Sequence, residues 1–566
     1  MRWWEWTILL SLLVLGAAVR FDQLGKVGLS LNEIRDALIA EQPLTQLPAA
    51  VAQQTGTTPL PAILTHIAQH RWGRTETTAR ASAALFGSAT ILAVGLAGSV
   101  LFGAPALVGA ALLALAPAHI AASREVQAAA LAGLLVVGLV TCAWRVLQQP
   151  TWRKTLAFAA ISTAAFYSHY GAVPVLAAIL VVATVAAAFQ RDIRPATGRL
   201  FAASLAALFA FAPWLWLDAQ AGRGSVMYVP HITTDTFTGL VRAFTVDDRP
   251  VSPAWVIAVA CAAAAGVARG VFEARLASSL VTMSVVATVA TTLAVTYQLP
   301  HPFDPHQVLL LLPLYLLLAA RGFEWPLQLI RPPARPYLRA AVALAIIVPN
   351  LLVLRGPAAT PLPDWRTVAA VVGNNAWSDD AVAAPGAREA LLFYAPGLLR
   401  QVLPEAPAGR LASALEHGVR GWLVAPLSVQ LGGAWPELTG WINSGNVIDL
   451  SVGDDPLILY GGDTSRAMLL REIAGFDLPT AALARGRWLR DLLQQTGPVP
   501  AVFRLVDQLA AAEPGISLRN PELLNIVSLL VHSGHREQAR GLAARIAEAE
   551  PDWLEAQQAL VAVQSD

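Results

Sequence analysis

The stretch from Leu24 to Arg80 reads LGKVGLSLNEIRDALIAEQPLTQLPAAVAQQTGTTPLPAILTHIAQHRWGRTETTAR and lies between two hydrophobic segments. Connections between membrane spans are usually short, so a connection of this length is expected to have a function of its own. It places six ionisable side chains beside the expected bilayer: Glu33, Arg35, Asp36, His66, Arg71 and Arg74. The stretch is therefore the first candidate for a functional site.

The composition around this stretch is that of an integral membrane protein. Of 566 residues, 55% are hydrophobic and only 14% are charged, and the mean hydropathy is +0.54. A soluble protein is rarely so apolar. The net charge of +1 gives no indication of nucleic-acid binding. Cys142 and Cys261 both fall in apolar runs, which favours packing over a disulfide.

Apolar runs of roughly 20 residues, enough to cross a hydrocarbon core of about 30 Å, recur through the first two thirds of the chain. The first begins after Trp3, Trp4 and Trp6, which suit a membrane interface, so we interpret it as an uncleaved span. The predicted fold class is mainly α, a polytopic membrane protein with about eleven transmembrane helices near 5–20, 79–101, 104–122, 126–147, 154–169, 172–189, 199–218, 252–269, 276–296, 306–320 and 338–354.

Basic residues predict the orientation of these spans. If the N-terminus is inside, four consecutive cytoplasmic linkers are basic, as the positive-inside rule requires. They hold Arg145, Arg153 and Lys154; Arg191, Arg194 and Arg199; Arg269 and Arg275; and Arg321, Arg331, Arg335 and Arg339. We therefore expect a multi-pass protein of the cytoplasmic (inner) membrane, with the N-terminus inside and the C-terminal domain outside.

Three domains are expected. Residues 1–355 form the transmembrane domain, with a long first external loop at 21–78. Residues 356–478 alternate short apolar pieces with turn residues, which predicts an outer mixed α/β segment with strands at 421–427 and 447–450. Residues 479–566 have the pattern of paired helices.

The paired helices show an internal repeat. Thr496–Pro514 and Ser533–Pro551 align without gaps, so that Gly497 and Gly534 are 37 residues apart. A glycine at the helix turn and a proline at the end resemble a tetratricopeptide repeat, although a plain helical hairpin also fits the first copy. Such repeats would recruit a protein partner.

Features of the first loop follow one another in a definite order. Asn32 and Glu33 come just after a span, a turn lies at Thr57 to Leu60, and Arg80 begins the next span. They resemble the GT-C membrane glycosyltransferases, which include the protein O-mannosyltransferases and the lipid A aminoarabinose transferases. In that pattern an Asp-Glu pair, a Pro-Pro-Leu and an Arg hold these places. The resemblance covers roughly residues 1 to 375, and it implies a polyprenyl-phosphate sugar as donor.

Later motifs extend the resemblance. Glu125 matches the acidic residue expected after the third span, and Tyr167-Ser168-His169-Tyr170 resembles a Tyr-Thr-His-Tyr of relatives, although an aromatic belt at the interface also explains it. His306-Gln307 stands where relatives carry Arg-Tyr, and Asp364-Trp365-Arg366 matches a recurrent Asp-Trp-Arg.

The resemblance implies roles for individual residues. Asn32 and Glu33 occupy the catalytic pair, and groups near the donor phosphate or substrate are Arg80, Arg124, Glu125, His169, Arg223, Arg242 and His306. The departures from the family pattern that remove a charged side chain are Asn32 for Asp, Gln127 for Arg and His306 for Arg. An asparagine amide is no base near neutral pH, so a general-base role would move to Glu33 or Asp36.

Whether a cofactor is needed stays open at this point. Asp247-Asp248 with Glu33 would suit a divalent cation, since hard cations take clustered carboxylates. Some GT-C enzymes use such an ion and others do not.

The first hypothesis is a membrane glycosyltransferase that moves a hexosyl or pentosyl group from a polyprenyl-phosphate donor to an acceptor on the outer face of the cytoplasmic membrane. Its partners would be the donor lipid and the bilayer, and a protein at the C-terminal repeats. The alternative is a catalytically degenerate relative acting in binding or assembly in a cell-envelope glycan pathway, which the departures from the family pattern favour. A transporter is a weaker third hypothesis, because the spans are almost uncharged.

Overall fold

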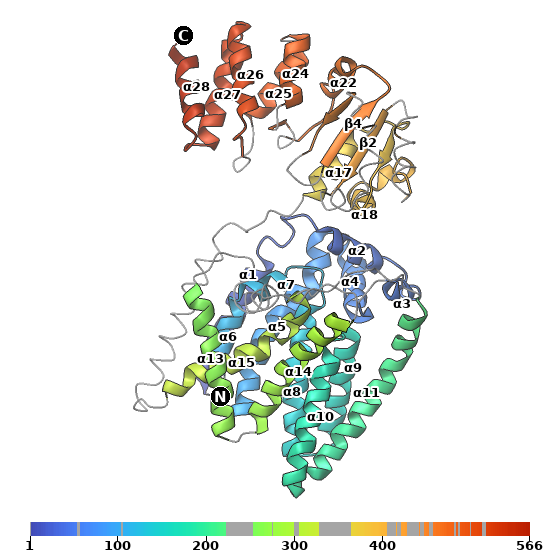
Figure 1. The fold of residues 1–566 in the computed structure, drawn as a ribbon, viewed down its shortest axis with the longest axis vertical. Helices are drawn as coiled ribbons and strands as arrows, with labels where there is room; N and C mark the ends of the chain where they lie inside the picture. The colour runs from blue at the N-terminus through green and yellow to red at the C-terminus, as the bar shows by residue number, and fades with distance from the viewer. Residues whose placement is uncertain are drawn as a thin grey trace. The chain divides into compact units, whose positions relative to one another are not determined.

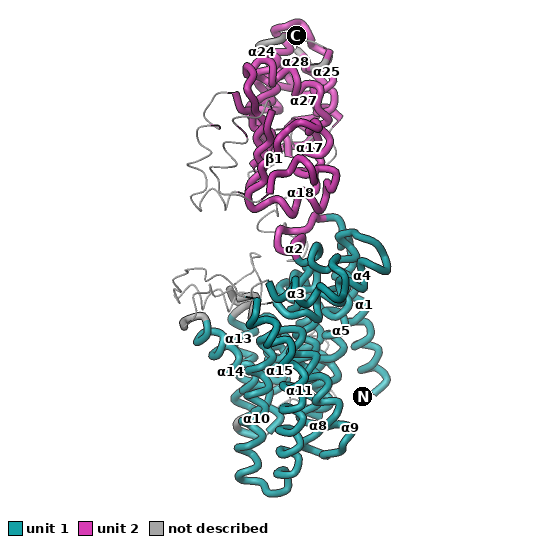
Figure 2. The backbone as a smooth tube through the Cα atoms, turned by 90° about the vertical axis from the view of Figure 1, so that its right-hand side faces the viewer, with its two compact units in different colours: residues 1–26, 36–361 teal, residues 27–35, 362–566 magenta. Residues whose placement is uncertain are grey.

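The computed structural model is mainly helical, with one small sheet (Figure 1). It describes residues 2–53, 57–103, 106–221, 253–273, 276–298, 305–327, 364–404, 415, 420–426, 441, 446–451, 457–479, 483–484, 487–497, 500–511 and 517–565. The chain divides into two units, which Figure 2 distinguishes by colour. Unit 1 comprises residues 1–26 and 36–361, and unit 2 comprises 27–35 and 362–566. Helix α2 (Leu31–Ala40) therefore begins in unit 2 and ends in unit 1.

Unit 1 is a bundle of apolar helices. Its elements are α1 (Trp3–Phe21), α3 (Leu47–Ala52), α4 (Pro59–Trp72), α5 (Glu76–Phe102), α6 (Leu107–Ala114), α7 (Pro117–Ala122), α8 (Ala129–Gln148), α9 (Trp152–Ser168), α10 (Ala172–Phe189), η1 (Arg191–Ile193), α11 (Arg194–Gln220), α13 (Pro253–Phe272), α14 (Leu276–Gln298), η2 (Pro305–Leu311) and α15 (Leu312–Leu327). In the described part of the chain, seven helices are long and apolar enough to cross a membrane. The predicted fold class, a polytopic membrane protein, is confirmed.

Two predicted spans have a different form. The span expected at 306–320 begins as the 3-10 helix η2 and continues as α15. The apolar run at 104–122 is expected as one helix, but it contains two short helices, because α6 ends at Ala114 and α7 begins at Pro117. Proline has no backbone N–H and its ring obstructs the preceding turn, so a helix rarely continues through it. The predicted span at 338–354 lies outside the described residues.

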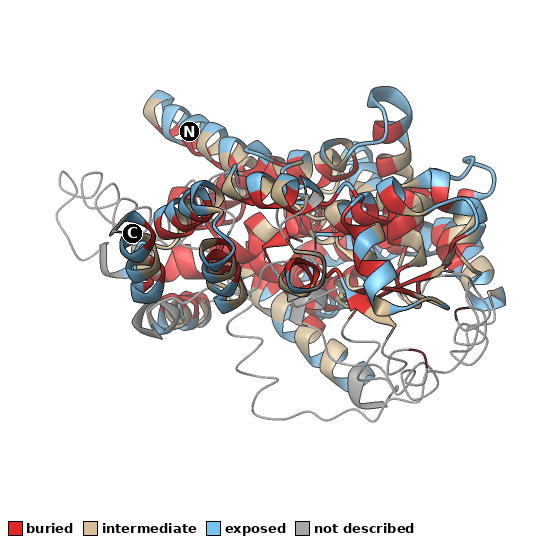
Figure 3. Cartoon of the chain, turned by 90° about the horizontal axis from the view of Figure 1, so that it is seen from above, coloured by how far each residue is buried: buried red, intermediate tan, exposed pale blue. Residues whose placement is uncertain are grey.

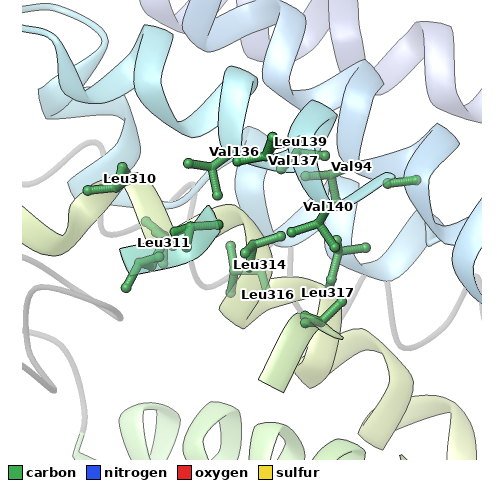
Figure 4. Packing of buried hydrophobic residues seen from close by; sticks show 14 of the residues in the cluster. Val94, Val136, Val137, Leu139, Val140, Leu310, Leu311, Leu314, Leu316 and Leu317 are labelled. Atoms are coloured by element: carbon green, nitrogen blue, oxygen red, sulfur yellow. The ribbon is translucent and has the colours of Figure 1, made fainter. Parts of the chain in front are cut away.

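The outer faces of the bundle are apolar as well as its interior. Figure 4 shows the centre, where Val94 of α5, Val136 and Val140 of α8, and Leu314 and Leu317 of α15 pack together. On α11, Leu205, Phe209 and Trp216 are exposed. Buried and exposed faces run side by side along the helices in Figure 3. A helix that is hydrophobic all round suits a bilayer, where lipid covers the outer face.

Unit 2 contains a four-stranded sheet in the order β1-β2-β4-β3, where β1 is Ala381–Ala383, β2 Arg420–Ala425, β3 Val447–Asp449 and β4 Leu457–Gly462. β1 and β2 are parallel, while β4 pairs antiparallel with both β2 and β3. The strands expected at 421–427 and 447–450 correspond to β2 and β3. Helices α17 (Trp365–Asn375), α18 (Arg388–Tyr394), η4 (Pro396–Arg400) and α22 (Arg466–Ile473) belong to the same unit.

The chain ends in paired helices. They are α24 (Arg487–Thr496), α25 (Pro500–Ala510), α26 (Pro521–His532), α27 (Arg536–Ala549) and α28 (Leu554–Ser565). Gly497 between α24 and α25 has a φ of +69°, and Gly534 between α26 and α27 has a φ of +82°. Both conformations favour glycine, which explains why the repeat keeps it at these turns. The tetratricopeptide resemblance and the three-domain division stay predictions.

Candidate functional site

Two arginines from distant parts of unit 1 bond to the chain at the end of α1. Arg124 donates from Nη1 to the Val19 carbonyl (3.1 Å) and from Nη2 to the Gln23 carbonyl (3.4 Å). Arg80, at the start of α5, is buried and donates from Nη1 to the Leu24 carbonyl (3.1 Å). The last carbonyls of a helix have no partner within it, so cationic donors are favourable there. We name Arg80, Arg124 and residues 19–24 the α1-end site.

Arg20 belongs to the same segment, but its side chain is fully buried inside the bundle. Its donors reach only neutral acceptors among the described residues, and two of these are the last carbonyls of α6. Arg20 donates from Nη1 to the carbonyls of Gly16 (2.8 Å) and Ala114 (2.9 Å), from Nη2 to the Leu113 carbonyl (3.0 Å) and His119 Nδ1 (2.8 Å), and from Nε to Ser123 Oγ (3.3 Å).

This arrangement fixes the path of the broken segment α6–α7. Because His119 Nδ1 accepts from Arg20, the histidine proton lies on Nε2. Ser123 Oγ in turn donates to the His119 carbonyl (2.5 Å), immediately before Arg124. No motif in the sequence predicts a role for Arg20, His119 or Ser123. The available signal was an arginine and a histidine inside apolar runs, which inside a membrane is unusual.

Glu33 has a clear structural role at the start of α2. Its Oε2 accepts from the Ser30 N–H (2.9 Å), while Ser30 Oγ accepts from the Glu33 N–H (3.3 Å). This is a capping box, in which Ser at the N-cap and Glu three residues later satisfy each other's backbone donors. The glutamate residue is only 1% exposed. Its carboxylate is therefore held by the helix start rather than directed to solvent.

Two other polar residues of α2, Asn32 and Asp36, are less buried than Glu33. Asn32 is exposed and Asp36, four residues on, is half-buried. Residues four apart lie one above the other on a helix. Asp36 is thus the carboxylate that shares a face with Asn32.

The rest of the first loop is anchored to the end of α2. His66 of α4 bonds through Nδ1 to the Ala40 carbonyl (2.7 Å), and Arg74 pairs with Glu41 (2.7 Å). Burial raises the pKa of the Glu41 carboxyl above its ordinary value, and the charge of Arg74 opposes that shift. The loop that the sequence marks as functional is therefore ordered by its own contacts.

His169 lies at the end of α9 among aromatic side chains. Its Nδ1 accepts from the Gly171 N–H (2.9 Å). Tyr170 accepts from Trp214 Nε1 (2.9 Å), and Tyr167 donates to the Ala210 carbonyl (2.9 Å). These contacts join the end of α9 and the turn that follows it to α11, so Tyr167 and Tyr170 have a packing role.

The structure brings some predicted residues together and leaves others apart. Arg80 and Arg124 share the α1-end site, and Glu125 follows Arg124 as a half-buried residue. Glu33 belongs to the other unit. Arg223 and Arg242 lie outside the described residues, as does the side chain of His306, whose backbone is part of η2.

Metal ligation has no support within the described ranges, where no group of three or more His, Cys, Asp or Glu side chains could hold an ion. Asp247 and Asp248 are not among the described residues. A divalent cation at Asp247, Asp248 and Glu33 therefore stays a prediction.

The Asp364-Trp365-Arg366 motif begins a helix of unit 2. Asp364 caps α17 by accepting from the Thr367 N–H (3.3 Å), and Trp365 is 1% exposed. The same unit includes Leu29, whose N–H donates to the Tyr394 hydroxyl (2.7 Å). Two of the three motif residues therefore serve the local fold.

No protein-family model and no curated protein matches this sequence. Solved structures do resemble it. ArnT from Cupriavidus metallidurans in the apo state is 14% identical with a TM-score of 0.53, over 80% of this chain and 97% of that one. The same protein bound to undecaprenyl phosphate is 15% identical with a TM-score of 0.53, over 82% of this chain and 99% of that one. The oligosaccharyltransferase from Archaeoglobus fulgidus in the apo form is 13% identical with a TM-score of 0.50, over 94% of this chain and 86% of that one. The chain therefore has the fold of the GT-C membrane glycosyltransferases.

Proposed function

We propose that this protein is a glycosyltransferase that moves a sugar from a polyprenyl-phosphate donor to an acceptor on the outer face of the cytoplasmic membrane. The observation that carries the proposal is the α1-end site on a GT-C fold, because two arginines meet there beside the long first loop. The solved relative with undecaprenyl phosphate supports the class of donor. A protein partner at the C-terminal helices is part of the proposal, as is the external position of unit 2.

Arg80 and Arg124 are suited to the phosphate of the donor. A guanidinium keeps its positive charge at all ordinary pH values, and its planar fork of N–H donors matches the geometry of a phosphate. Charge-assisted bonds of this kind stabilise the negative charge that grows on the leaving phosphate during transfer. The backbone bonds to residues 19, 23 and 24 hold the two side chains in position beforehand.

A carboxylate of α2 would act as the general base. It takes the proton of the acceptor hydroxyl while the acceptor oxygen bonds to the anomeric carbon. The bond from that carbon to the phosphate oxygen breaks, and polyprenyl phosphate leaves. Asp36 suits this role better than Glu33, because Glu33 is buried and accepts from Ser30. Asp36 also belongs to unit 1 together with both arginines.

Two isosteric variants test this assignment. Proteoliposomes containing undecaprenyl-phosphate hexoses or pentoses, one at a time, receive envelope glycans as acceptor, and the released undecaprenyl phosphate is measured. We expect Asp36→Asn to lower turnover by about a hundredfold or more, as loss of a general base does. Glu33→Gln should keep most of the activity, because glutamine at the third helical position also completes a capping box.

The opposite result would identify Glu33 as the base and refute the role of Asp36. If the wild-type protein turns over no donor of either class, the transferase proposal itself is wrong.

One observation favours the degenerate relative as a second candidate. Of the two residues at the expected acidic pair, Asn32 is exposed but has no carboxylate, and Glu33 has a carboxylate but is buried. In that case the wild-type protein would bind undecaprenyl phosphate without releasing it from any sugar. Asn32→Asp would then produce turnover that the wild type lacks.

A further inference from the structure

A cavity with both basic and apolar lining residues lies at the end of the unit 1 bundle opposite the α1-end site. It has a volume of about 570 Å³ and forms where α5 and α8 end and where α9 and α14 begin. Arg80 is near the first residue of α5 and Phe102 is its last. At 1.5 Å per residue these positions are about 33 Å apart, roughly the thickness of the hydrocarbon core. The cavity therefore belongs to the other membrane surface.

The charge in this cavity is positive. Arg145 and Lys154 line it, together with Gln148 and Gln149, and no carboxylate is present among its described lining residues. Lys154 donates from Nζ to Gln149 Oε1 (2.8 Å), which holds the ammonium group at the cavity. The cavity volume of about 570 Å³ is large enough for a small polar group, since ligand sites typically measure about 300–1,000 Å³.

The helix dipoles explain only part of this charge. Arg145 is in the last turn of α8, where a cation is favourable on its own account. Lys154 is in the first turn of α9, where the helix end is itself partly positive. Lysine at that place is unfavourable unless an anion lies nearby. The position of Lys154 is therefore favourable when an anionic ligand is bound, and it does not stabilise α9 by itself.

The remaining wall is apolar. Trp144 donates from Nε1 to the Val100 carbonyl (2.9 Å) and so joins α8 to α5 at the edge of the cavity. Leu276 of α14 and Phe102 of α5 complete that side. Tryptophan and mixed polar and apolar surfaces are typical of the level of lipid headgroups. A ligand with both a phosphate and a hydrocarbon part matches such a lining.

We propose that this cavity binds the phosphate headgroup of an anionic phospholipid of the surrounding bilayer. Basic pockets between transmembrane helices recognise headgroups of this kind on the cytoplasmic side, which is the side that the basic linkers predict here. The proposal does not depend on the transferase function, because it concerns the other membrane surface.

The test compares lipid binding by two matched double variants. The full-length protein in neutral detergent receives phosphatidylglycerol or phosphatidylcholine with the same acyl chains, and native mass spectrometry measures the bound lipid. Arg145→Gln with Lys154→Gln should lower phosphatidylglycerol occupancy by at least about fivefold. Arg153→Gln with Arg191→Gln removes the same charge from exposed residues outside the cavity lining, and should change occupancy less than about twofold.

Three results would overturn the proposal. The first is an equal loss of phosphatidylglycerol occupancy in both double variants. The second is binding of phosphatidylcholine by the wild type to the same extent as phosphatidylglycerol. The third is displacement of phosphatidylglycerol by millimolar inorganic phosphate, which would make free phosphate the ligand. If the double variant at Arg145 and Lys154 is unstable, each single variant gives the same comparison. Donor turnover is measured separately, so a failed transferase proposal leaves this result unaffected.

Discussion

At the scale of a residue, the guanidinium of Arg20 is buried in the bundle and donates hydrogen bonds to neutral acceptors, among them the Leu113 and Ala114 carbonyls. Arg20→Met would leave the Leu113 and Ala114 carbonyls without this donor, and each buried unpaired group costs about 1–3 kcal/mol. We expect a markedly lower melting temperature in detergent. Arg20→Lys should be at least as harmful, because lysine keeps the charge but has three donors instead of five.

Arg153→Met is the matched control for this substitution. Arg153 is exposed, so its replacement should leave the melting temperature nearly unchanged. An Arg20→Lys protein as stable as the wild type would contradict the role assigned to this residue.

Glu33 illustrates what could be predicted from the sequence at this scale. The order Ser30-Leu31-Asn32-Glu33 before an apolar helical pattern is a capping-box signature, so its structural role could have been predicted from the four residues alone. The bonds of Arg80 and Arg124 to residues 19–24 could not have been predicted. They join residues that are 56 and 105 positions apart, and no local pattern specifies such pairings.

At the scale of an element, α13 and α15 approach closely through glycine. A Cβ atom at Gly322 would overlap the Ala262 carbonyl, and one at Gly266 would overlap the Leu318 carbonyl. Small residues let membrane helices pack backbone to backbone. Gly322→Val should therefore force the helices apart and cost about 1–3 kcal/mol or more, measured as a fall in melting temperature.

Gly198 of α11 provides the control, since a Cβ there meets nothing within 4 Å. Gly198→Ala should stabilise the helix slightly, because alanine loses less backbone freedom than glycine. Equal effects at positions 198 and 322 would show that close packing of α13 on α15 is unimportant.

The long apolar spans follow from hydrophobicity, and most of the predicted ones have a helix in the described parts of the chain. The break between α6 and α7 does not follow from it. Hydropathy measures only how apolar a run is, whereas the break depends on Pro117 and on the donors of Arg20 that satisfy the freed carbonyls. Arg20 lies almost a hundred residues earlier in the chain, so the sequence of the apolar run at 104–122 does not show which donor satisfies these carbonyls.

At the scale of the whole molecule, the sequence predicts a GT-C fold from motifs whose residues turn out to have mixed roles. Arg80 and Arg124 meet at one site, while Glu33 and Asp364 cap helices and Tyr167 and Tyr170 join helices. Motif order was therefore a better guide to the fold than to the function of each residue. The division into units explains part of this, because Glu33 and Asp36 are neighbours in sequence but belong to different units.

Binding of undecaprenyl phosphate tests the α1-end site most directly. Purified wild-type protein in nanodiscs should bind it saturably, and Arg80→Gln or Arg124→Gln should each weaken binding by about tenfold or more, the usual cost of a charged hydrogen bond to phosphate. Arg145→Gln with Lys154→Gln should leave this binding unchanged, which would separate the two proposed lipid sites. Wild-type protein that does not bind undecaprenyl phosphate, or folded Arg80→Gln and Arg124→Gln proteins that bind it as the wild type does, would contradict the account.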